Sequence, residues 1–278
     1  MTLLWIDGRV LAPEQATVAA LDHGLTVGDG VFETCKVVAG QPFALSRHLR
    51  RLAHSAEVLG LPEPDRDRIA RAVTELVAGS PVLPLGRLRI TLTSGAGPLG
   101  SARDPSAATL VLALAPAKPW PGHIAVVTVP WTRNERSAIV GAKTTSYAEN
   151  VVALAAAHRA GGQEAVLSNT VEQLCEGTGS NVVVEIDGQL VTPPLSSGCL
   201  AGITRELFLE WAAADGLPCA ESELEFGVLA RADDVLLTST TRDVQQVAVA
   251  DGRRVPGSDL GRAAVELFAR RAAERSDP

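Results

Sequence analysis

Residues 140–157 read VGAKTTSYAENVVALAAA and place a lysine, Lys143, between an apolar segment and the start of a helix. The chain of 278 residues has 25 Lys and Arg residues, and its lysines are Lys36, Lys118 and Lys143. Small and hydroxyl residues flank Lys143, and the alanine-rich run after it predicts a helix over residues 146–160. This placement of a rare residue indicates a specific role for Lys143.

The composition is that of an ordinary globular protein, with 46% hydrophobic and 21% charged residues. A net charge of −7 argues against a nucleic-acid-binding surface. The four cysteines have no C-x-x-C spacing and the histidines no metal-ligand spacing, so we expect reduced thiols, no metal and a cytoplasmic location. Asp7 comes too early for a signal peptide, and no apolar run reaches the roughly 20 residues of a membrane span.

The order of turns, strands and helices predicts an α+β protein with two domains. Asp-Gly pairs at residues 7–8, 187–188 and 251–252 predict two-residue hairpin turns. Strands outnumber helices, which argues against a doubly wound parallel sheet. The proline-rich segment PAKPWPG, residues 116–122, predicts a linker between a small N-terminal α/β domain, residues 1–115, and a larger, β-rich C-terminal α/β domain, residues 123–278.

Two amphipathic helices are predicted in the first domain. The segment SRHLRRLAHSAEVLG begins with Ser46 as a candidate N-cap and ends at Gly60. The segment DRDRIARAVTELVAG repeats the pattern with Asp65 and Gly79. On the first helix, Arg47 and Arg51 share a face, which is either solvated or able to present a guanidinium to a phosphate.

Several short motifs each allow a structural and a functional interpretation. GAGPLG, residues 95–100, matches a dinucleotide fingerprint, but Pro98 and the loop residues after it favour a plain loop. In LAGITREL, residues 200–207, Thr204 can cap a helix whose first N–H groups form an anion site, or it is an N-cap alone. Thr240 and Thr241 follow an apolar strand and are either phosphate donors or a polar turn. Glu176 is either a partly buried carboxylate that needs a cation or a solvated loop residue.

Together these residues meet the needs of pyridoxal 5'-phosphate, which binds a lysine, an anion at its ring nitrogen, and an arginine and other donors at its phosphate. Six ordered segments resemble the class IV (fold type IV) pyridoxal-phosphate enzymes. This family includes D-amino-acid transaminases, branched-chain aminotransferases, (R)-selective amine transaminases and aminodeoxychorismate lyases. The segments are DHGLTVGDGVFETCKV (22–37), RHLRRLAHSA (47–56), AKTTSYAENVVAL (142–154), EGTGSNVVV (176–184), LSSGCLAGITRE (195–206) and DDVLLTSTTRDV (233–244).

The resemblance implies a homodimer of two-domain subunits and assigns roles to individual residues. Lys143 would carry the cofactor as an aldimine and act as the catalytic base. Glu176 would contact the ring nitrogen, and Arg51 would contact the phosphate. The remaining implied cofactor contacts are Leu200, Ile203, Thr204, Thr240 and Thr241. The implied substrate-pocket residues are Phe32, Thr34, Tyr147 and Arg103, and Phe32 and Glu33 resemble an aromatic–acid pair that lines the small-domain side of the pocket.

The resemblance also implies a transaminase that moves an amino group from a D-amino acid, or from an (R)-amine, to a 2-keto acid. The alternative is a 4-amino-4-deoxychorismate lyase, which releases p-aminobenzoate and pyruvate. D-amino-acid transaminases carry an arginine that grips the substrate carboxylate in a loop where this chain has Ser94 and Leu99, and Arg103 is the nearest candidate. The GDGVFET segment, residues 28–34, resembles D-amino-acid transaminases more than the bacterial lyase, so the transaminase is the prediction and the lyase is the alternative.

Overall fold

The computed structural model describes residues 2–104 and 108–278, which form two compact units. The first unit contains the chain up to Pro119, Ala142–Tyr147 and Asp277, and the second contains Trp120–Gly141, Ala148–Ser276 and Pro278. The chain first passes from one unit to the other after Pro119, which is within the linker predicted at residues 116–122. Residues 142–147, which the prediction placed in a C-terminal domain of residues 123–278, belong to the first unit instead.

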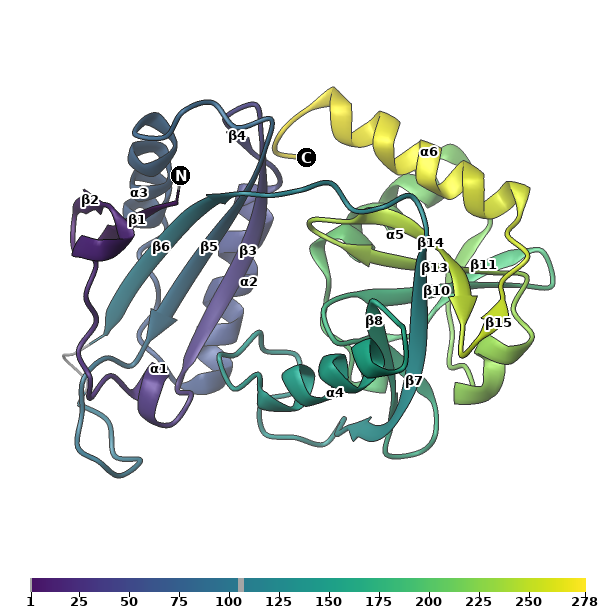
Figure 1. Cartoon of the computed structure of the whole chain (residues 1–278), viewed down its shortest axis with the longest axis horizontal. Coiled ribbons are helices and arrows are strands. Elements are labelled where there is room, and N and C mark those ends of the chain that lie inside the picture. Colours follow the sequence, from purple (N-terminus) through teal and green to yellow (C-terminus); the bar gives the residue numbers. More distant parts are fainter. Residues whose placement is uncertain (1, 105–107) are drawn as a thin grey trace. The chain divides into compact units, whose positions relative to one another are not determined.

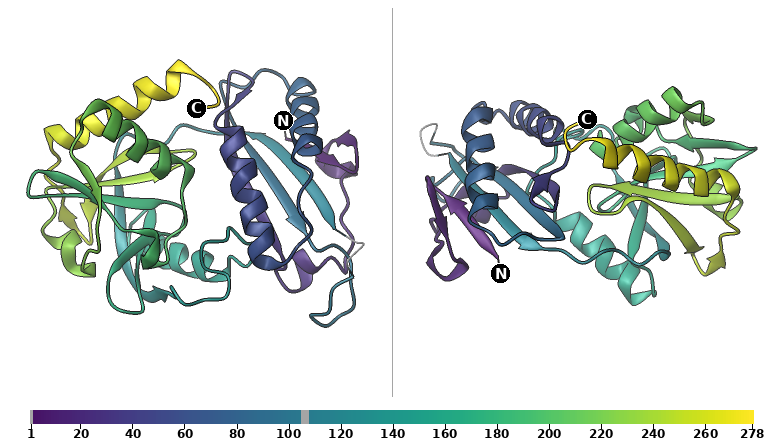
Figure 2. Two further views of the ribbon diagram at one scale, coloured as in Figure 1. Left: turned by 180° about the vertical axis from the view of Figure 1, so that it is seen from behind. Right: turned by 90° about the horizontal axis from the view of Figure 1, so that it is seen from above.

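The first unit is built on an antiparallel six-stranded sheet with the order β2-β1-β6-β5-β3-β4. Its strands are β1 (Leu3–Ile6), β2 (Arg9–Leu11), β3 (Gly30–Val38), β4 (Gln41–Pro42), β5 (Leu85–Thr93) and β6 (Thr109–Pro116). Its helices are η1 (Pro13–Gln15), α1 (His23–Thr26), α2 (Leu45–Leu59) and α3 (Arg66–Ala78). Helices α2 and α3 pack on the same face of the sheet (Figures 1 and 2).

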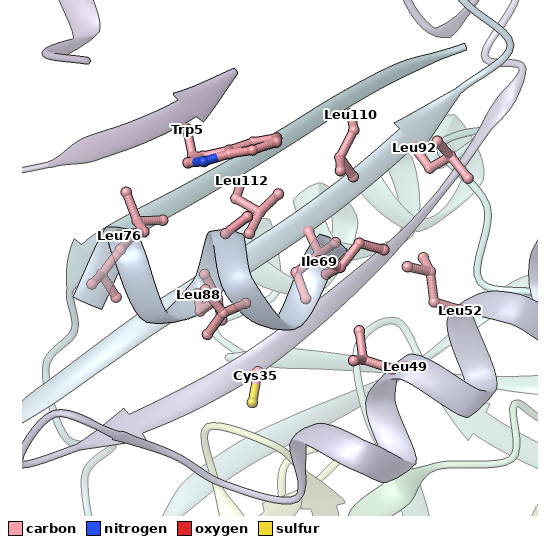
Figure 3. Packing of buried hydrophobic residues seen from close by; sticks show 14 of the residues in the cluster. Trp5, Cys35, Leu49, Leu52, Ile69, Leu76, Leu88, Leu92, Leu110 and Leu112 are labelled. Atoms are coloured by element: carbon pink, nitrogen blue, oxygen red, sulfur yellow. The ribbon is translucent and has the colours of Figure 1, made fainter. Parts of the chain in front are cut away.

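The core of this unit lies between that face and the two long helices (Figure 3). Strand β5 shows why the two faces differ: Leu88, Ile90 and Leu92 are buried, whereas Arg87 and Arg89 are exposed between them. Successive side chains of a strand point to opposite faces, so β5 presents its apolar side chains to the helices and its arginines to the other face.

The second unit contains a mixed nine-stranded sheet with the order β12-β11-β10-β13-β14-β7-β8-β9, and β15 pairs with β14. Its strands are β7 (Ile124–Arg133), β8 (Glu164–Asn169), β9 (Leu174–Gly177), β10 (Asn181–Ile186), β11 (Gln189–Thr192), β12 (Cys219–Glu221), β13 (Asp234–Ser239), β14 (Asp243–Ala250) and β15 (Arg253–Arg254). Its helices are α4 (Ala148–Arg159), η2 (Leu195–Ser197), α5 (Ile203–Asp215), η3 (Phe226–Ala230) and α6 (Asp259–Glu274). Helix α4 connects the parallel strands β7 and β8, and α6 packs on α5 and β14 (Figure 1).

The local signals of the sequence place most turns and helix ends correctly. Both residues of each Asp-Gly pair have positive φ, and each pair joins two antiparallel strands. Asp65 caps α3 by accepting a hydrogen bond from the backbone N–H of Arg68, and Gly60 ends α2 at φ 64°. The prediction of Ser46 as N-cap is wrong: the N-cap is Ala44, two residues earlier, which has a left-handed conformation, and α2 starts at Leu45.

The mixture of helices with largely antiparallel sheets confirms the α+β class. Among the helices of residues 2–104 and 108–278, none is both long and apolar enough to cross a lipid bilayer.

Candidate active site

The segment that carries Lys143 is attached to the edge of β3 in the first unit. The backbone N–H of Phe32 donates to the carbonyl of Lys143 at 2.9 Å, and the N–H of Thr145 donates to the carbonyl of Gly30 at 2.8 Å. On its other side, the N–H of Lys143 donates to Oγ of Ser55 on α2 at 3.0 Å. A Cβ atom at Gly30 would lie 2.9 Å from the carbonyl oxygen of Leu92, so only glycine fits there. The backbone of Lys143 is therefore fixed from two sides.

Two aromatic rings lie beside the amine of Lys143, and a second cation stacks on one of these rings. Its Nζ lies 4.6 Å from the ring centroid of Phe32 and 5.7 Å from that of Tyr147. The two rings meet edge to face, with centroids 5.2 Å apart. The guanidinium carbon of Arg89 lies 3.6 Å from the Phe32 centroid, and Arg89 is paired with Thr34 across β3 and β5. The structure thus brings Lys143, Phe32 and Tyr147 together and adds Arg89, which the sequence analysis missed, while Thr34 is the cross-strand neighbour of Arg89.

Glu33 lies on the opposite face of β3 from Phe32, so the expectation that these two residues line one pocket is wrong. The Glu33 carboxylate is fully buried under α2, where Nε and Nη2 of Arg51 each donate to it at 2.7 Å. Nδ1 of His48 lies 2.7 Å from Oε2 of Glu33. Burial opposes ionisation, but the charge and hydrogen bonds of Arg51 and the contact with His48 outweigh it and lower the pKa of Glu33 to about 2. Burial lowers the pKa of His48.

The Arg103 guanidinium is hydrogen-bonded to other groups of the first unit. Its Nε and Nη2 donate to the two carboxylate oxygens of Asp29, each at 2.6 Å. Its Nη1 donates to the carbonyls of Leu59 and Gly60 at the end of α2. Arg103 therefore ties its loop to α2, and this geometry gives no support to Arg103 as a substrate contact.

In the second unit, Glu176 at the end of β9 is 8% exposed, which excludes the solvated-loop interpretation. The backbone N–H of Leu200 donates to its Oε2 at 2.9 Å, and Nε of Arg133 lies 3.1 Å from its Oε1. Both Nη atoms of Arg133 donate to Oδ1 of Asn150, whose Nδ2 donates to the carbonyl of Thr178 at 2.6 Å. Glu176 is thus a buried carboxylate with a cation partner, and this partner offsets the cost of burying its charge.

The N-terminus of α5 lies two residues after Leu200. Gly202 is the N-cap and no side chain caps the helix, so the prediction that Thr204 is the cap is wrong. Ile203 and Thr204 are buried in the first turn. A Cβ atom at Gly202 would lie 1.9 Å from Oδ1 of Asn181, whose Nδ2 donates to the carbonyl of Leu200. The N–H groups of this first turn and the helix dipole are suited to an anion.

Thr240 and Thr241 form the hairpin turn between β13 and β14. Nε1 of Trp120 donates to Oγ1 of Thr241 at 3.2 Å. Arg242 stacks on the Trp120 ring at 3.5 Å and forms a buried ion pair with Glu164 at 2.9 Å. The polar-turn interpretation therefore describes the local structure, and the ion pair holds the turn in place.

The residues that the sequence analysis missed are Arg89, Ser55, Arg133 and Asn150. Arg89 has one local signal, a polar position in the alternating pattern of β5. No local sequence signal marks Arg133 or Asn150. Their roles come from contacts with Glu176 and Thr178, which are distant in the sequence.

A lysine with a fixed backbone, a buried carboxylate and an uncapped helix N-terminus are the groups that pyridoxal phosphate requires. The sequence model described as amino-transferase class IV matches residues 30–250, and the chain belongs to this family. The family uses pyridoxal 5'-phosphate, which confirms the predicted cofactor.

Relatives within the family differ in the activity that their names state. A putative branched-chain-amino-acid aminotransferase of Methanocaldococcus jannaschii is 30% identical over 93% of this chain and 91% of its own length. A bifunctional aminodeoxychorismate lyase / D-amino acid transaminase of Mycobacterium tuberculosis is 32% identical over 94% of this chain and 96% of its own length.

Solved structures give the same family. A branched-chain aminotransferase of Thermoproteus uzoniensis with norvaline superposes with a TM-score of 0.91 at 28% identity, covering 98% of this chain and 95% of that one. A hypothetical aminotransferase of Mycobacterium tuberculosis in its pyridoxal-phosphate-bound form has a TM-score of 0.86 at 29% identity, covering 99% and 100% of the two chains.

Proposed function

We propose that this protein is a pyridoxal-phosphate-dependent transaminase that moves an amino group from a D-amino acid to a 2-keto acid. The observation that carries the proposal is the position of Lys143, whose backbone is fixed to β3 and Ser55 while its amine lies beside the Phe32 and Tyr147 rings. A fixed backbone limits the positions of the amine, which favours its use as the group that bonds the cofactor.

The chain offers suitable groups for each part of the cofactor. Glu176 would hold the proton on the ring nitrogen, because a buried carboxylate stabilises an adjacent positive charge. Arg51, the first turn of α5 with Ile203 and Thr204, and the hydroxyls of Thr240 and Thr241 would bind the phosphate, and Leu200 would pack on the ring. When bound, the cofactor supplies an electron-poor ring that stabilises negative charge at the substrate Cα.

In this mechanism Lys143 has two tasks. Its Nζ would hold the cofactor and, once free of it, would remove the proton from the substrate Cα. The protonated Lys143 amine would then be the donor that gives this proton back, so one residue would serve as covalent anchor and as acid and base. The charge of Arg133, 3.1 Å from Oε1 of Glu176, would favour the ionised carboxylate.

For the substrate carboxylate we propose Arg89 in place of Arg103. Arg89 stacks on the ring that Lys143 also contacts, whereas the guanidinium of Arg103 is bound to Asp29 and α2. Although the Arg89 side chain is exposed as a whole, partial desolvation of its guanidinium lowers its pKa, and a carboxylate ligand would offset that cost. A site with this cation fits amino acids better than it fits simple (R)-amines.

The D configuration is supported by the name of the Mycobacterium tuberculosis relative, and the GDGVFET segment resembles D-amino-acid transaminases. The same relative also supports a second candidate function, the aminodeoxychorismate lyase, because its name states both activities. Both reactions begin with the same proton transfer by Lys143, so the residues described above serve either one.

We also propose a homodimer in the cytoplasm. Large apolar side chains of the second unit are exposed on β7, in the segment after it and on α4: Trp131, Ile139, Val140, Val151 and Val152. A partner subunit would remove these side chains from water. The four cysteines are free, which is consistent with a reducing compartment.

A half-reaction without acceptor tests the function. Protein loaded with cofactor is mixed in turn with D-alanine, L-leucine and (R)-1-phenylethylamine, and the absorbance of the bound cofactor is followed. The proposal predicts a full spectral change with D-alanine and one keto acid released per cofactor. A response to L-leucine alone would contradict the D configuration. If no donor changes the spectrum, transamination is refuted and p-aminobenzoate release from aminodeoxychorismate becomes the next assay.

A further inference from the structure

Glu33 is the centre of a buried polar cluster that the proposed mechanism does not use directly. Its carboxylate accepts two hydrogen bonds from Arg51 and contacts His48, all at 2.7 Å. Glu33 is 0% exposed, His48 1% and Arg51 9%. His48 and Arg51 are three residues apart on α2 and therefore face the same strand, β3.

The bonding pattern restricts how the Arg51 guanidinium can lie. Its Nε and Nη2 face the two oxygens of one carboxylate, so the guanidinium plane and one of its edges are fixed. The Glu33 carboxylate is fixed in turn by Nδ1 of His48. An arginine without such partners would lose several hydrogen bonds on burial and would favour rotamers that reach water.

From this arrangement we infer that Glu33 and His48 are positioning residues, which hold the Arg51 guanidinium in the orientation with which it binds the cofactor phosphate. The inference rests on the proposed role of Arg51. Neither Glu33 nor His48 touches the cofactor in this proposal; both act through Arg51.

Charge and orientation predict opposite effects here, which makes the inference testable. The Glu33 carboxylate is negative and by its charge alone would repel a phosphate. If Glu33 only compensated the charge of Arg51, replacing it with glutamine would strengthen phosphate binding. If Glu33 orients Arg51, the same replacement weakens phosphate binding.

The experiment compares two ligands that differ only in the phosphate. Full-length protein is titrated with pyridoxal 5'-phosphate and, separately, with pyridoxal, and the dissociation constants are measured. His48→Leu removes the Nδ1 contact, whereas His48→Asn keeps a side-chain N–H near the same position. Glu33→Gln is the second variant. His54→Leu, at an exposed position of the same helix, is the matched control.

We expect His48→Leu and Glu33→Gln to weaken pyridoxal phosphate binding about tenfold, the equivalent of one misplaced charged hydrogen bond, and to leave pyridoxal binding unchanged. His48→Asn should recover most of the affinity, and His54→Leu should match the wild type. Equal losses for both ligands would indicate a purely structural role and overturn the inference, as would unchanged or stronger phosphate binding. If the wild type itself does not prefer pyridoxal phosphate to pyridoxal, the proposed function fails first.

Discussion

Nε of Arg133 lies 3.1 Å from Oε1 of Glu176, and both Nη atoms of the same guanidinium donate to Asn150. Arg133 ends β7 and Glu176 lies in β9, so the pair joins two strands that are separated in the sheet by β8. Nε of Arg133 makes no aligned hydrogen bond with any described residue, so its contact with Glu176 is an ion pair. Its positive charge stabilises the ionised carboxylate that the proposed function requires.

Replacing Arg133 with methionine should therefore weaken the interaction between the Glu176 carboxylate and the protonated ring nitrogen of the cofactor. We expect turnover to fall about tenfold or more and the absorbance of the bound cofactor to titrate at a different pH from the wild type. Arg136→Met is the control, because Arg136 is exposed and contacts Glu135 rather than Glu176. An unchanged titration curve in Arg133→Met would show that Arg133 does not act on Glu176.

Lys143→Ala should abolish turnover and leave phosphate binding in place. The amine is the proposed base and covalent anchor, so we expect a loss of about 1,000-fold or more. Single-turnover assays measure this loss, and equilibrium dialysis measures whether the variant still retains pyridoxal phosphate. Lys118→Ala, which changes a lysine of the predicted linker, is the control. Activity within tenfold of the wild type would rule out Lys143 as the base.

Arg89→Met should act on substrates according to whether they carry a carboxylate. We expect KM for D-alanine to rise about tenfold, the equivalent of one charged hydrogen bond, with little change for (R)-1-phenylethylamine if the protein accepts this amine. Arg87→Met changes the neighbouring exposed arginine on the same face of β5 and serves as the control. If Arg89→Met leaves KM for D-alanine unchanged, another residue binds the carboxylate.

The Glu33–Arg51 pair should make stability depend on acid pH. The pKa of Glu33 falls from an ordinary 4.5 to about 2 in the folded protein, so the unfolded chain binds its proton first as the pH drops. The stabilising contribution is therefore complete above about pH 4.5 and is lost as the pH falls toward 2.

Glu33→Gln should lower the free energy of unfolding by about 3–5 kcal/mol at pH 7, because it leaves Arg51 buried without its partner. Between pH 4.5 and 2, its stability should fall less steeply than that of the wild type. Urea unfolding at a series of pH values measures both effects, with Glu57→Gln at an exposed position of α2 as the control. Parallel curves for wild type and Glu33→Gln would contradict the assignment.

Much of the fold was predictable because its signals are local. The positive φ angles at Asp7-Gly8, Asp187-Gly188 and Asp251-Gly252 follow from residue type, and so do the cap at Asp65 and the stop at Gly60. The α+β class, the family and the cofactor were also predicted and are confirmed. The roles of individual site residues remain predictions, now with defined surroundings.

What the sequence determined by itself is the set of elements and the chemical groups on them, because hydrophobic periodicity and turn chemistry act over a few residues. The tertiary structure alone decided which distant groups meet. In the folded chain, residues 142–147 belong to the first unit and hydrogen-bond to β3. Glu33 contacts Arg51, Arg103 contacts Asp29, and Arg133 lies beside Glu176. These contacts depend on strand pairing and on the packing of helices against sheets, so no local pattern encodes them.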